Sequence, residues 1–223
     1  MSVKDFRDNP LYKRARGEKD SVWMTVLCIL VIALMAFFVC VRFYVRENYG
    51  GVIVDGDSMN NTLVDGDALL MKYTEKGAEA DYGDVIVVYV GGYSEWADVK
   101  DAKGNRINYI IKRLIAKDGD TVKAENGQLY LMKEGETEFS LLNEPYAYYS
   151  AGAEAYQDFY YRVDEGEIFF LGDNRMNSND SRYAQGHSEL NRLYKEEDIY
   201  GVVPQWAIEY RKTLEFFFLN NIK

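Results

Sequence analysis

Cysteine and histidine are almost absent from this chain of 223 residues. The two cysteines, Cys28 and Cys40, lie in one apolar run, and on a helix they would stand roughly 18 Å apart, too far for a disulfide. This excludes a disulfide scaffold and a zinc site built from thiolates. His187 is the only histidine, so no metal site with two histidines can form, and we interpret it as a surface residue of a polar stretch.

Positively charged residues are outnumbered by negatively charged ones. The chain has 26 Lys and Arg against 36 Asp and Glu, and its formal net charge is -10. Proteins that bind phosphate backbones carry basic surfaces, so this balance argues against a nucleic-acid partner.

One long run without charge lies near the N-terminus, at residues 22–41 (VWMTVLCILVIALMAFFVCV). Twenty helical residues span the hydrocarbon layer of a bilayer, roughly 30 Å thick. A cleaved secretory signal has a shorter apolar core followed by small residues, whereas Arg42, Phe43 and Tyr44 follow here. The run therefore predicts a transmembrane helix that stays attached.

The cations that flank this run predict its orientation. Six precede it and two follow it, namely Lys4, Arg7, Lys13, Arg14, Arg16 and Lys19 before, and Arg42 and Arg46 after. Because the more basic flank stays in the cytoplasm, residues 1–21 are expected to be a cytoplasmic tail and residues 42–223 an extracytoplasmic domain. We expect a single-pass protein of the plasma membrane.

Short β-rich runs separated by Gly-containing turns dominate the rest of the chain, at 51–54, 68–73, 84–90, 107–116, 128–132, 167–172 and 199–203. No long amphipathic helical pattern separates them, so we expect a mainly β, antiparallel domain. Residues 139–163 differ, because they hold six tyrosines. This stretch is either an aromatic surface at the lipid interface or a packed insertion, and we favour the insertion.

Three segments carry polar residues that a β core does not need. Ser58 lies in DGDSMNNTL (55–63), where by itself it reads as a turn serine. Lys112 and Arg113 interrupt an apolar run, and on a strand one of these two neighbours must face inward. A buried lysine tends to lose its charge, although a half-exposed one would extend its ammonium to water. The third segment, GDNRMNSNDSR (172–182), resembles a hydrogen-bonded loop with an Asp–Arg pair.

Taken in order behind an apolar anchor, these segments resemble the type I signal peptidases (leader peptidases), in a bacterial and Gram-positive-like form. The matching motifs are SMNNTL (58–63), YGDVIVVY (82–89), IIKRLIAKDGDTV (110–122) and LGDNRMNSNDSR (171–182). The resemblance covers the anchor and nearly all of residues 50–203 except 139–163. It implies an antiparallel β domain of the signal-peptidase and repressor-peptidase type.

The resemblance also implies an activity, the removal of N-terminal signal peptides after small residues (Ala-x-Ala) by a Ser/Lys dyad. Ser58 falls on the nucleophile and Lys112 on the general base. The expected supporting residues are Ser178, which would help orient the lysine, together with Asp173, Asp180, Arg182 and Arg113, and the expected substrate-cleft residues are Met59 and Leu63. The implied partners are signal peptides and the lipid bilayer, with no cofactor and no metal, and a monomer is expected.

The sequence departs from the family pattern at several positions. Asn61 replaces the usual proline of the serine motif, and Met176 replaces a usual acid. The segment Ala116–Asp120 lacks the usual Gly-x-Pro beginning. Gly56 stands where some bacterial members carry an oxyanion-hole serine, so backbone N–H groups near Ser58 would have to replace it.

Two other classes of protein share parts of this pattern. A non-catalytic tethered β domain, as in some pilus-assembly relatives, would lack the lysine, so Lys112 argues against it. Self-cleaving repressors are a second class. They lack an N-terminal anchor and carry a DNA-binding domain, and neither of these two descriptions fits this chain.

Overall fold

The structure is a computed structural model that describes residues 10–75, 79–92, 100, 104–149, 156–182 and 194–214, with side chains from residue 22 onward. His187 lies outside the described residues. The chain forms two compact units, Met1–Asn48 and Tyr49–Lys223. The expected boundary at residue 42 therefore falls inside the first unit.

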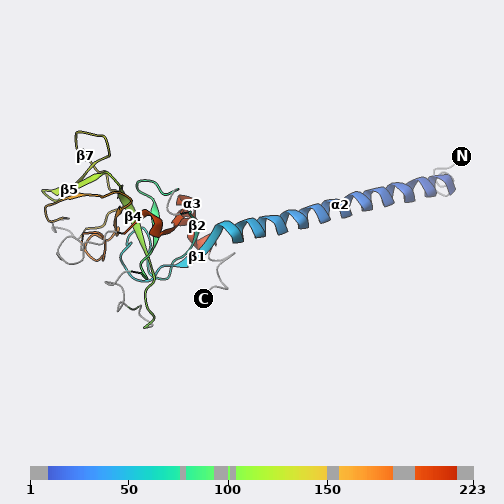
Figure 1. Cartoon of the computed structure of the whole chain (residues 1–223). Helices are drawn as coiled ribbons and strands as arrows, with labels where there is room; N and C mark the ends of the chain where they lie inside the picture. The colour runs from blue at the N-terminus through green and yellow to red at the C-terminus, as the bar shows by residue number, and fades with distance from the viewer. Residues whose placement is uncertain are drawn as a thin grey trace. The chain divides into compact units, whose positions relative to one another are not determined.

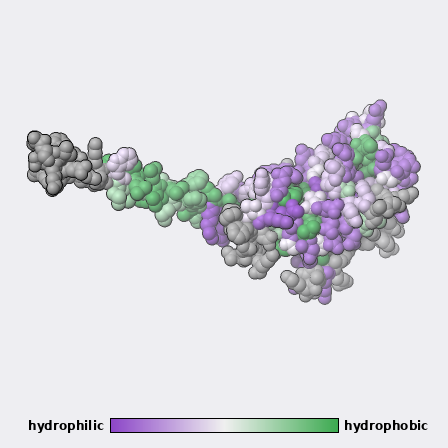
Figure 2. Space-filling model, turned by 180° about the vertical axis from the view of Figure 1, so that it is seen from behind, coloured by the Kyte–Doolittle hydropathy of each residue, from purple (hydrophilic) through white to green (hydrophobic). Residues whose placement is uncertain are grey.

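The first unit contains the helix α2 (Pro10–Asn48). Its segment Val22–Asn48 contains an 18-residue window with a mean hydropathy of 3.0, and it is long and apolar enough to cross a membrane. Figure 2 shows the apolar part of this helix in green. The helix predicted over residues 22–41 is confirmed, and it continues to Asn48. No glycine or proline interrupts the chain between residue 42 and Gly50, so nothing ends the helix earlier.

The second unit is built from two antiparallel sheets (Figure 1). The larger has the order β1-β2-β10-β3-β4-β9, with β1 (Tyr49–Ile53), β2 (Ala68–Tyr73), β3 (Val85–Tyr89), β4 (Tyr109–Lys117), β9 (Ile168–Leu171) and β10 (Ile199–Val203). The smaller has the order β7-β6-β5-β8, with β5 (Thr121–Glu125), β6 (Gln128–Met132), β7 (Ser140–Leu141) and β8 (Phe159–Arg162). Short helices η3 (Glu196–Asp198), α3 (Gln205–Glu209) and α4 (Arg211–Leu214) flank β10. The mainly β, antiparallel class is confirmed.

Both faces of the larger sheet are buried, as the strand β3 shows. Val85 and Val87 belong to one hydrophobic cluster, and Ile86 and Val88 belong to another. Since successive residues of a strand point to opposite faces, a core covers each side. A third cluster joins the two sheets and includes Phe169 of β9.

This double burial corrects one expectation from the sequence. One of the two neighbouring cations of β4 was expected to face inward, but both are buried, with Lys112 4% and Arg113 7% exposed. The expectation assumed a sheet with one face in solvent, whereas this sheet has none at β4. Each cation therefore needs its own compensation inside the protein.

Candidate active site

The loop that follows β1 carries Ser58. The backbone turns back on itself here, with Val54 and Asp67 hydrogen-bonded across the base of the loop (2.9 Å). Gly56 has a φ of 89°, a conformation that favours glycine, at the position where the chain enters the turn. The loop thus presents Ser58 beside the start of β4.

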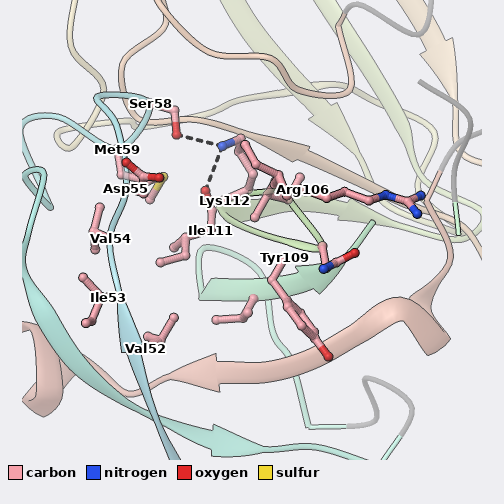
Figure 3. A pocket seen from close by; sticks show the side chains of 14 residues that line it. Val52, Ile53, Val54, Asp55, Ser58, Met59, Arg106, Tyr109, Ile111 and Lys112 are labelled. Carbon is pink, nitrogen blue, oxygen red and sulfur yellow. Dashed lines mark hydrogen bonds between the residues drawn. The ribbon is translucent and has the colours of Figure 1, made fainter. Parts of the chain in front are cut away.

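Lys112 extends from β4 to this serine. Its Nζ donates to Ser58 Oγ at 2.7 Å and to the Ile111 carbonyl at 2.9 Å, as Figure 3 shows. Strand pairing fixes the backbone of Lys112 opposite Ile86 of β3. The structure therefore brings together the two residues on which the sequence analysis placed the nucleophile and the base.

The environment of Lys112 favours its neutral form. Burial lowers the pKa of Lys112 to about 8, although the carboxylates of Asp180 and Asp173 act in the opposite direction. With that pKa, about a tenth of the molecules hold a neutral lysine at pH 7. The hydrogen bond to Ser58 can then be reversed, with the hydroxyl as donor and the amine as acceptor.

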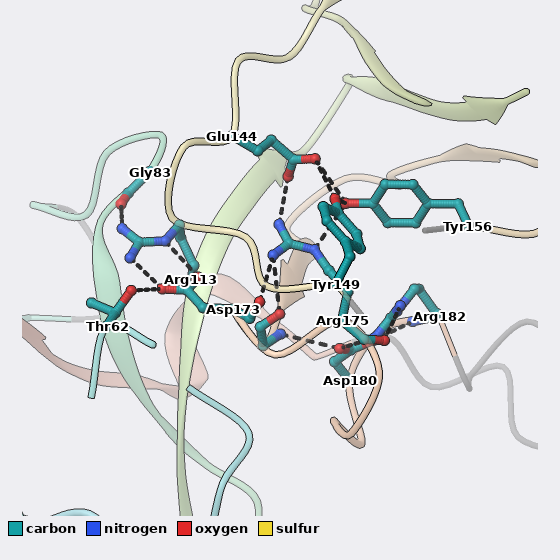
Figure 4. Close-up of polar contacts among 11 residues, drawn as sticks. Thr62, Gly83, Arg113, Glu144, Tyr149, Tyr156, Asp173, Arg175, Asp180 and Arg182 are labelled. Atoms are coloured by element: carbon teal, nitrogen blue, oxygen red, sulfur yellow. Dashed lines mark hydrogen bonds and ion pairs between the residues drawn. The ribbon is translucent and has the colours of Figure 1, made fainter. Parts of the chain in front are cut away.

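Arg113, the next residue on β4, forms a two-point ion pair with Asp173. Its Nε lies 2.8 Å from Asp173 Oδ1, and its Nη2 donates to Asp173 Oδ2. The remaining amino group donates to the Gly83 carbonyl, and Thr62 donates its hydroxyl to Asp173 Oδ2 (Figure 4). Because Asp173 is fully buried, this arrangement neutralises it and connects β4 to the loop after β9.

A second ion pair lies within that loop. Arg182 donates its Nε and Nη2 to the two carboxylate oxygens of Asp180, each at 2.8 Å. Asp180 also accepts the Gly172 N–H at 3.1 Å, while Arg182 donates to the Arg175 carbonyl at 2.9 Å. The Asp–Arg pair expected from the segment 172–182 is therefore present, and it closes the loop on itself.

Ser178 is buried beside these groups but forms no hydrogen bond with the described residues. A Cβ atom on Gly172 would lie 2.1 Å from Ser178 Oγ and 2.5 Å from the Ser58 carbonyl oxygen. Ser178 is thus packed near the nucleophile, although no hydrogen bond connects it to Lys112 in this structure.

A cleft of about 300 Å³ opens at Ser58 and Lys112. It lies between residues 52–55, which end β1 and continue beyond it, and the start of β4 (Figure 3). Met59 lines it, as expected. Leu63 does not, because it is fully buried in the cluster beneath, beside Leu69 and Val85. Its position supports the floor of the site instead of the cleft wall.

Comparison with known proteins shows which family the chain belongs to. The family model described as signal peptidase, peptidase S26, matches residues 22–209. This chain belongs to that family. It is 31% identical to signal peptidase I U of Bacillus subtilis (strain 168) over 179 residues, which are 80% of this chain and 83% of the relative. Signal peptidase I T of the same organism is 31% identical over 160 residues, 71% of this chain and 74% of the relative. A solved signal peptidase I of Enterococcus faecalis V583 aligns with 56% of this chain and 97% of its own at 25% identity, with a TM-score of 0.41.

Membership of the signal peptidase family confirms the resemblance inferred from the motifs, and it makes the chain a peptidase. Together with the apolar helix, it indicates a protein anchored in a membrane. Among the described residues, no three His, Cys, Asp or Glu side chains gather where a metal ion could be held.

Several residues of this candidate site were not predicted from the sequence. Asn174 holds the loop of Ser58, because its N–H donates to the Ser58 carbonyl (3.0 Å) and its side chain to the Asp57 carbonyl (3.1 Å). Arg175 is buried and pairs with Glu144. Asn174 and Arg175 stood inside a quoted motif, whereas Glu144 stood in the Tyr-rich stretch, which had no motif to indicate a role.

Proposed function

We propose that this chain is a membrane-bound serine endopeptidase that removes N-terminal signal peptides from secretory preproteins, with Ser58 as nucleophile and Lys112 as general base. One observation carries the proposal. A lysine that is 4% exposed donates to a serine hydroxyl at 2.7 Å, at the mouth of a cleft, in a chain of the signal peptidase family.

Acylation follows from the reversed hydrogen bond. The neutral Nζ of Lys112 accepts the proton of Ser58 as Oγ attacks the scissile carbonyl carbon. The C–N bond of the substrate then breaks, and the new ammonium gives its proton to the leaving amine. Ser58 is left as an ester of the signal peptide, and Lys112 is neutral again.

Deacylation uses the same base. Lys112 takes a proton from a water molecule, whose oxygen attacks the ester carbon. Breaking the C–Oγ bond releases the signal peptide with a free carboxyl group and returns the proton from Lys112 to Ser58. This is the Ser–Lys form of the serine-protease scheme, without a histidine.

The negative oxygen of each tetrahedral intermediate needs hydrogen-bond donors. In the described part of the chain, the backbone N–H of Ser58 donates to no other group, so it is free to serve. The N–H of Gly56 is engaged by Asp65 Oδ1 at 2.9 Å. We therefore propose that the backbone N–H of Ser58 is the main backbone donor to this negative oxygen.

The cleft suits an extended peptide with small side chains. Within the described residues, β1 has a strand partner on one side only, so its free edge can pair with a substrate strand. In such a strand, the first and third residues before the cleaved bond (−1 and −3) point their side chains the same way, toward Val52, Val54 and Ile111. A cleft of about 300 Å³ shared with the backbone leaves room for alanine at both positions, which supports Ala-x-Ala specificity.

The supporting residues keep the two reacting groups in place. Arg113 and Asp173 join β4 to the loop after β9, and Arg182 and Asp180 close that loop. We assign Ser178 to the orientation of Lys112 during turnover, on the ground of its buried position beside Gly172. Met59 contributes to the cleft wall.

The apolar helix would hold this site at the outer membrane surface, where cleavage sites of exported proteins emerge. The excess of cations before the helix supports a cytoplasmic N-terminus. Protease added outside intact spheroplasts should then digest the β domain and leave the N-terminal tail. Digestion of the tail alone would reverse the proposed orientation.

The function is tested by incubating a preprotein that has an Ala-x-Ala site with detergent-solubilised wild type and with Ser58→Ala. We expect one cut after the final alanine, identified by N-terminal sequencing of the product, and none with Ser58→Ala. Replacing the −1 alanine by leucine should abolish the cut. Failure of the folded wild type to cleave would favour a tethered domain without catalytic activity.

A further inference from the structure

The Tyr-rich stretch contains a buried carboxylate that pairs with the catalytic loop. Glu144 Oε1 accepts from Arg175 Nη2, and both side chains are buried, 8% and 0% exposed (Figure 4). Glu144 Oε2 accepts the hydroxyl proton of Tyr156 at 2.8 Å, and that hydroxyl in turn accepts from Arg175 Nε at 2.8 Å. Two groups of the stretch thus hold one guanidinium from two directions.

The same stretch also pairs with the loop through its backbone. The Tyr148 N–H donates to the Asp173 carbonyl at 2.7 Å, and the Tyr148 carbonyl accepts the Arg175 N–H at 3.1 Å. The ring of Tyr146 lies 3.9 Å from the guanidinium carbon of Arg113 and 5.7 Å from that of Arg175. Residues 144–149 therefore pack along one side of the turn at 172–175.

The opposite side of this turn contacts the nucleophile. Asn174 donates to the carbonyls of Ser58 and Asp57, and the Cα of Gly172 lies so close to the Ser58 carbonyl that a Cβ there would clash. Arg175 fixes the turn from inside, because its Nη1 donates to the Gly172 carbonyl at 3.2 Å and to the Asp173 carbonyl at 3.4 Å. The position of the turn therefore determines the position of Ser58.

Lys112 is fixed by other means, the pairing of β4 with β3 and β9. A displacement of the turn would move Ser58 relative to Lys112 and lengthen the 2.7 Å contact between them. A displacement of about 1 Å between reacting groups can lower the rate about 100-fold.

We propose that Glu144 is a positioning residue of the peptidase, acting through Arg175 and the 172–175 turn on Ser58. This inference rests on the proposed function, and it gives the Tyr-rich stretch a role in turnover. The competing explanation is that the Glu144–Arg175 pair only stabilises the fold. A buried ion pair is by itself weak evidence for net stability.

The test compares Glu144→Gln with Glu167→Gln in the full-length protein. Glu167 makes a matched control, because it accepts a tyrosine hydroxyl (Tyr161, 3.4 Å) but pairs with no arginine in the described structure. We expect Glu144→Gln to lower kcat about 10- to 100-fold with KM changed less than about threefold, at a temperature where it stays folded. Glu144→Asp, which keeps the charge but shortens the side chain, should retain the unfolding temperature and still lose kcat.

Hydrogen exchange supplies the second readout, and it needs no substrate. Glu144→Gln should raise exchange at the Asn174 and Arg175 amides and leave the β5–β6 amides protected. Wild-type kcat in Glu144→Gln, or a loss of kcat that only follows general unfolding with exchange increased in every strand, would overturn the positioning role. If the wild type cleaved no preprotein, the proposed function would fail, while the exchange measurement would still decide whether Glu144 holds the turn.

Discussion

Arg113 and Asp173 form a buried two-point ion pair that connects the strand of Lys112 to the loop that holds Ser58. Each is adjacent in sequence to a residue of the site, Arg113 to Lys112 and Asp173 to Asn174. The pair therefore contributes to the distance between the two halves of the proposed dyad, and neither of its members is hydrogen-bonded to Ser58 or Lys112.

Breaking this pair should destabilise the domain strongly. In Asp173→Asn the buried guanidinium of Arg113 would lose its counter-charge, and such a loss typically costs about 3–5 kcal/mol. We expect the free energy of unfolding in urea to fall by that amount. The exposed pair Lys195–Glu197 is the control, because Glu197→Gln should change it by less than about 1 kcal/mol. Equal effects in the two variants would contradict the role of the buried pair.

The rate should depend on pH through Lys112. Its base form is the neutral one, and burial lowers its pKa to about 8. We expect kcat/KM to rise about tenfold per pH unit below that value and to level off above it. Initial rates with substrate below KM, taken from pH 6 to 10 with fluorescence checks of folding, measure this. A rate that is flat from pH 6 to 9 would exclude Lys112 as the titrating base.

Lys112→Met should abolish cleavage and stabilise the fold at neutral pH. The pKa of Lys112 is lower in the folded chain (about 8) than its ordinary value of 10.5, so the unfolded chain binds more protons between these values. The buried lysine then lowers the stability below pH 8 by about 3 kcal/mol, and this cost disappears as the pH rises from 8 to 10.5. The loss of two hydrogen bonds in the variant offsets part of the gain.

Thermal unfolding at pH 7 and at pH 10 measures the difference between Lys112→Met and wild type. We expect a higher unfolding temperature for the variant at pH 7 and a smaller advantage at pH 10. Ser58→Ala serves as control, since it is inactive but keeps the buried lysine. An advantage of the same size at both pH values would show that it does not arise from titration of Lys112.

The sequence predicted the parts of this protein that depend on local pattern. Seven apolar runs became strands, because β-branched residues such as those of β3 suit a sheet buried on both faces. The strands β5, β7 and β8 were not predicted. Three of the five residues of β5 are polar (Thr121, Lys123, Glu125), and Val122 and Ala124 gain their burial only from the cluster that joins the two sheets.

The site shows the same limit. Ser58 and Lys112 were predicted from motifs, yet their contact joins positions 54 residues apart and depends on the fold. Glu144 could not be predicted, since a glutamate among tyrosines has no local signature. Its partner Arg175 stands 31 residues away, and both are buried only when the stretch packs on the loop. Such a pair becomes visible only when the two segments are placed in space.

Gly172 should tolerate no side chain, because the turn lies directly against the nucleophile. A Cβ there would meet the Ser58 carbonyl oxygen at 2.5 Å and the Ser178 Cβ at 2.6 Å. In Gly172→Ala the loop of Ser58 must shift, and we expect kcat to fall about 100-fold. Gly92→Ala is the control, since a Cβ there would meet a Tyr89 ring carbon only at 4.0 Å.

The double variant Gly172→Ala/Ser178→Ala separates the contact with the Ser178 hydroxyl from the other two contacts of that new methyl group. Removing the Ser178 hydroxyl relieves the shortest contact, 2.1 Å, but leaves the contacts with the Ser58 carbonyl oxygen at 2.5 Å and with the Cβ of residue 178 at 2.6 Å. Because Ser178 is itself assigned to the orientation of Lys112, the reference is Ser178→Ala alone. If the position of Ser58 limits the rate, the double variant is about 100-fold slower than Ser178→Ala. A double variant as fast as Ser178→Ala would mean instead that the clash with the Ser178 hydroxyl caused the loss, and that the turn can move without displacing the nucleophile.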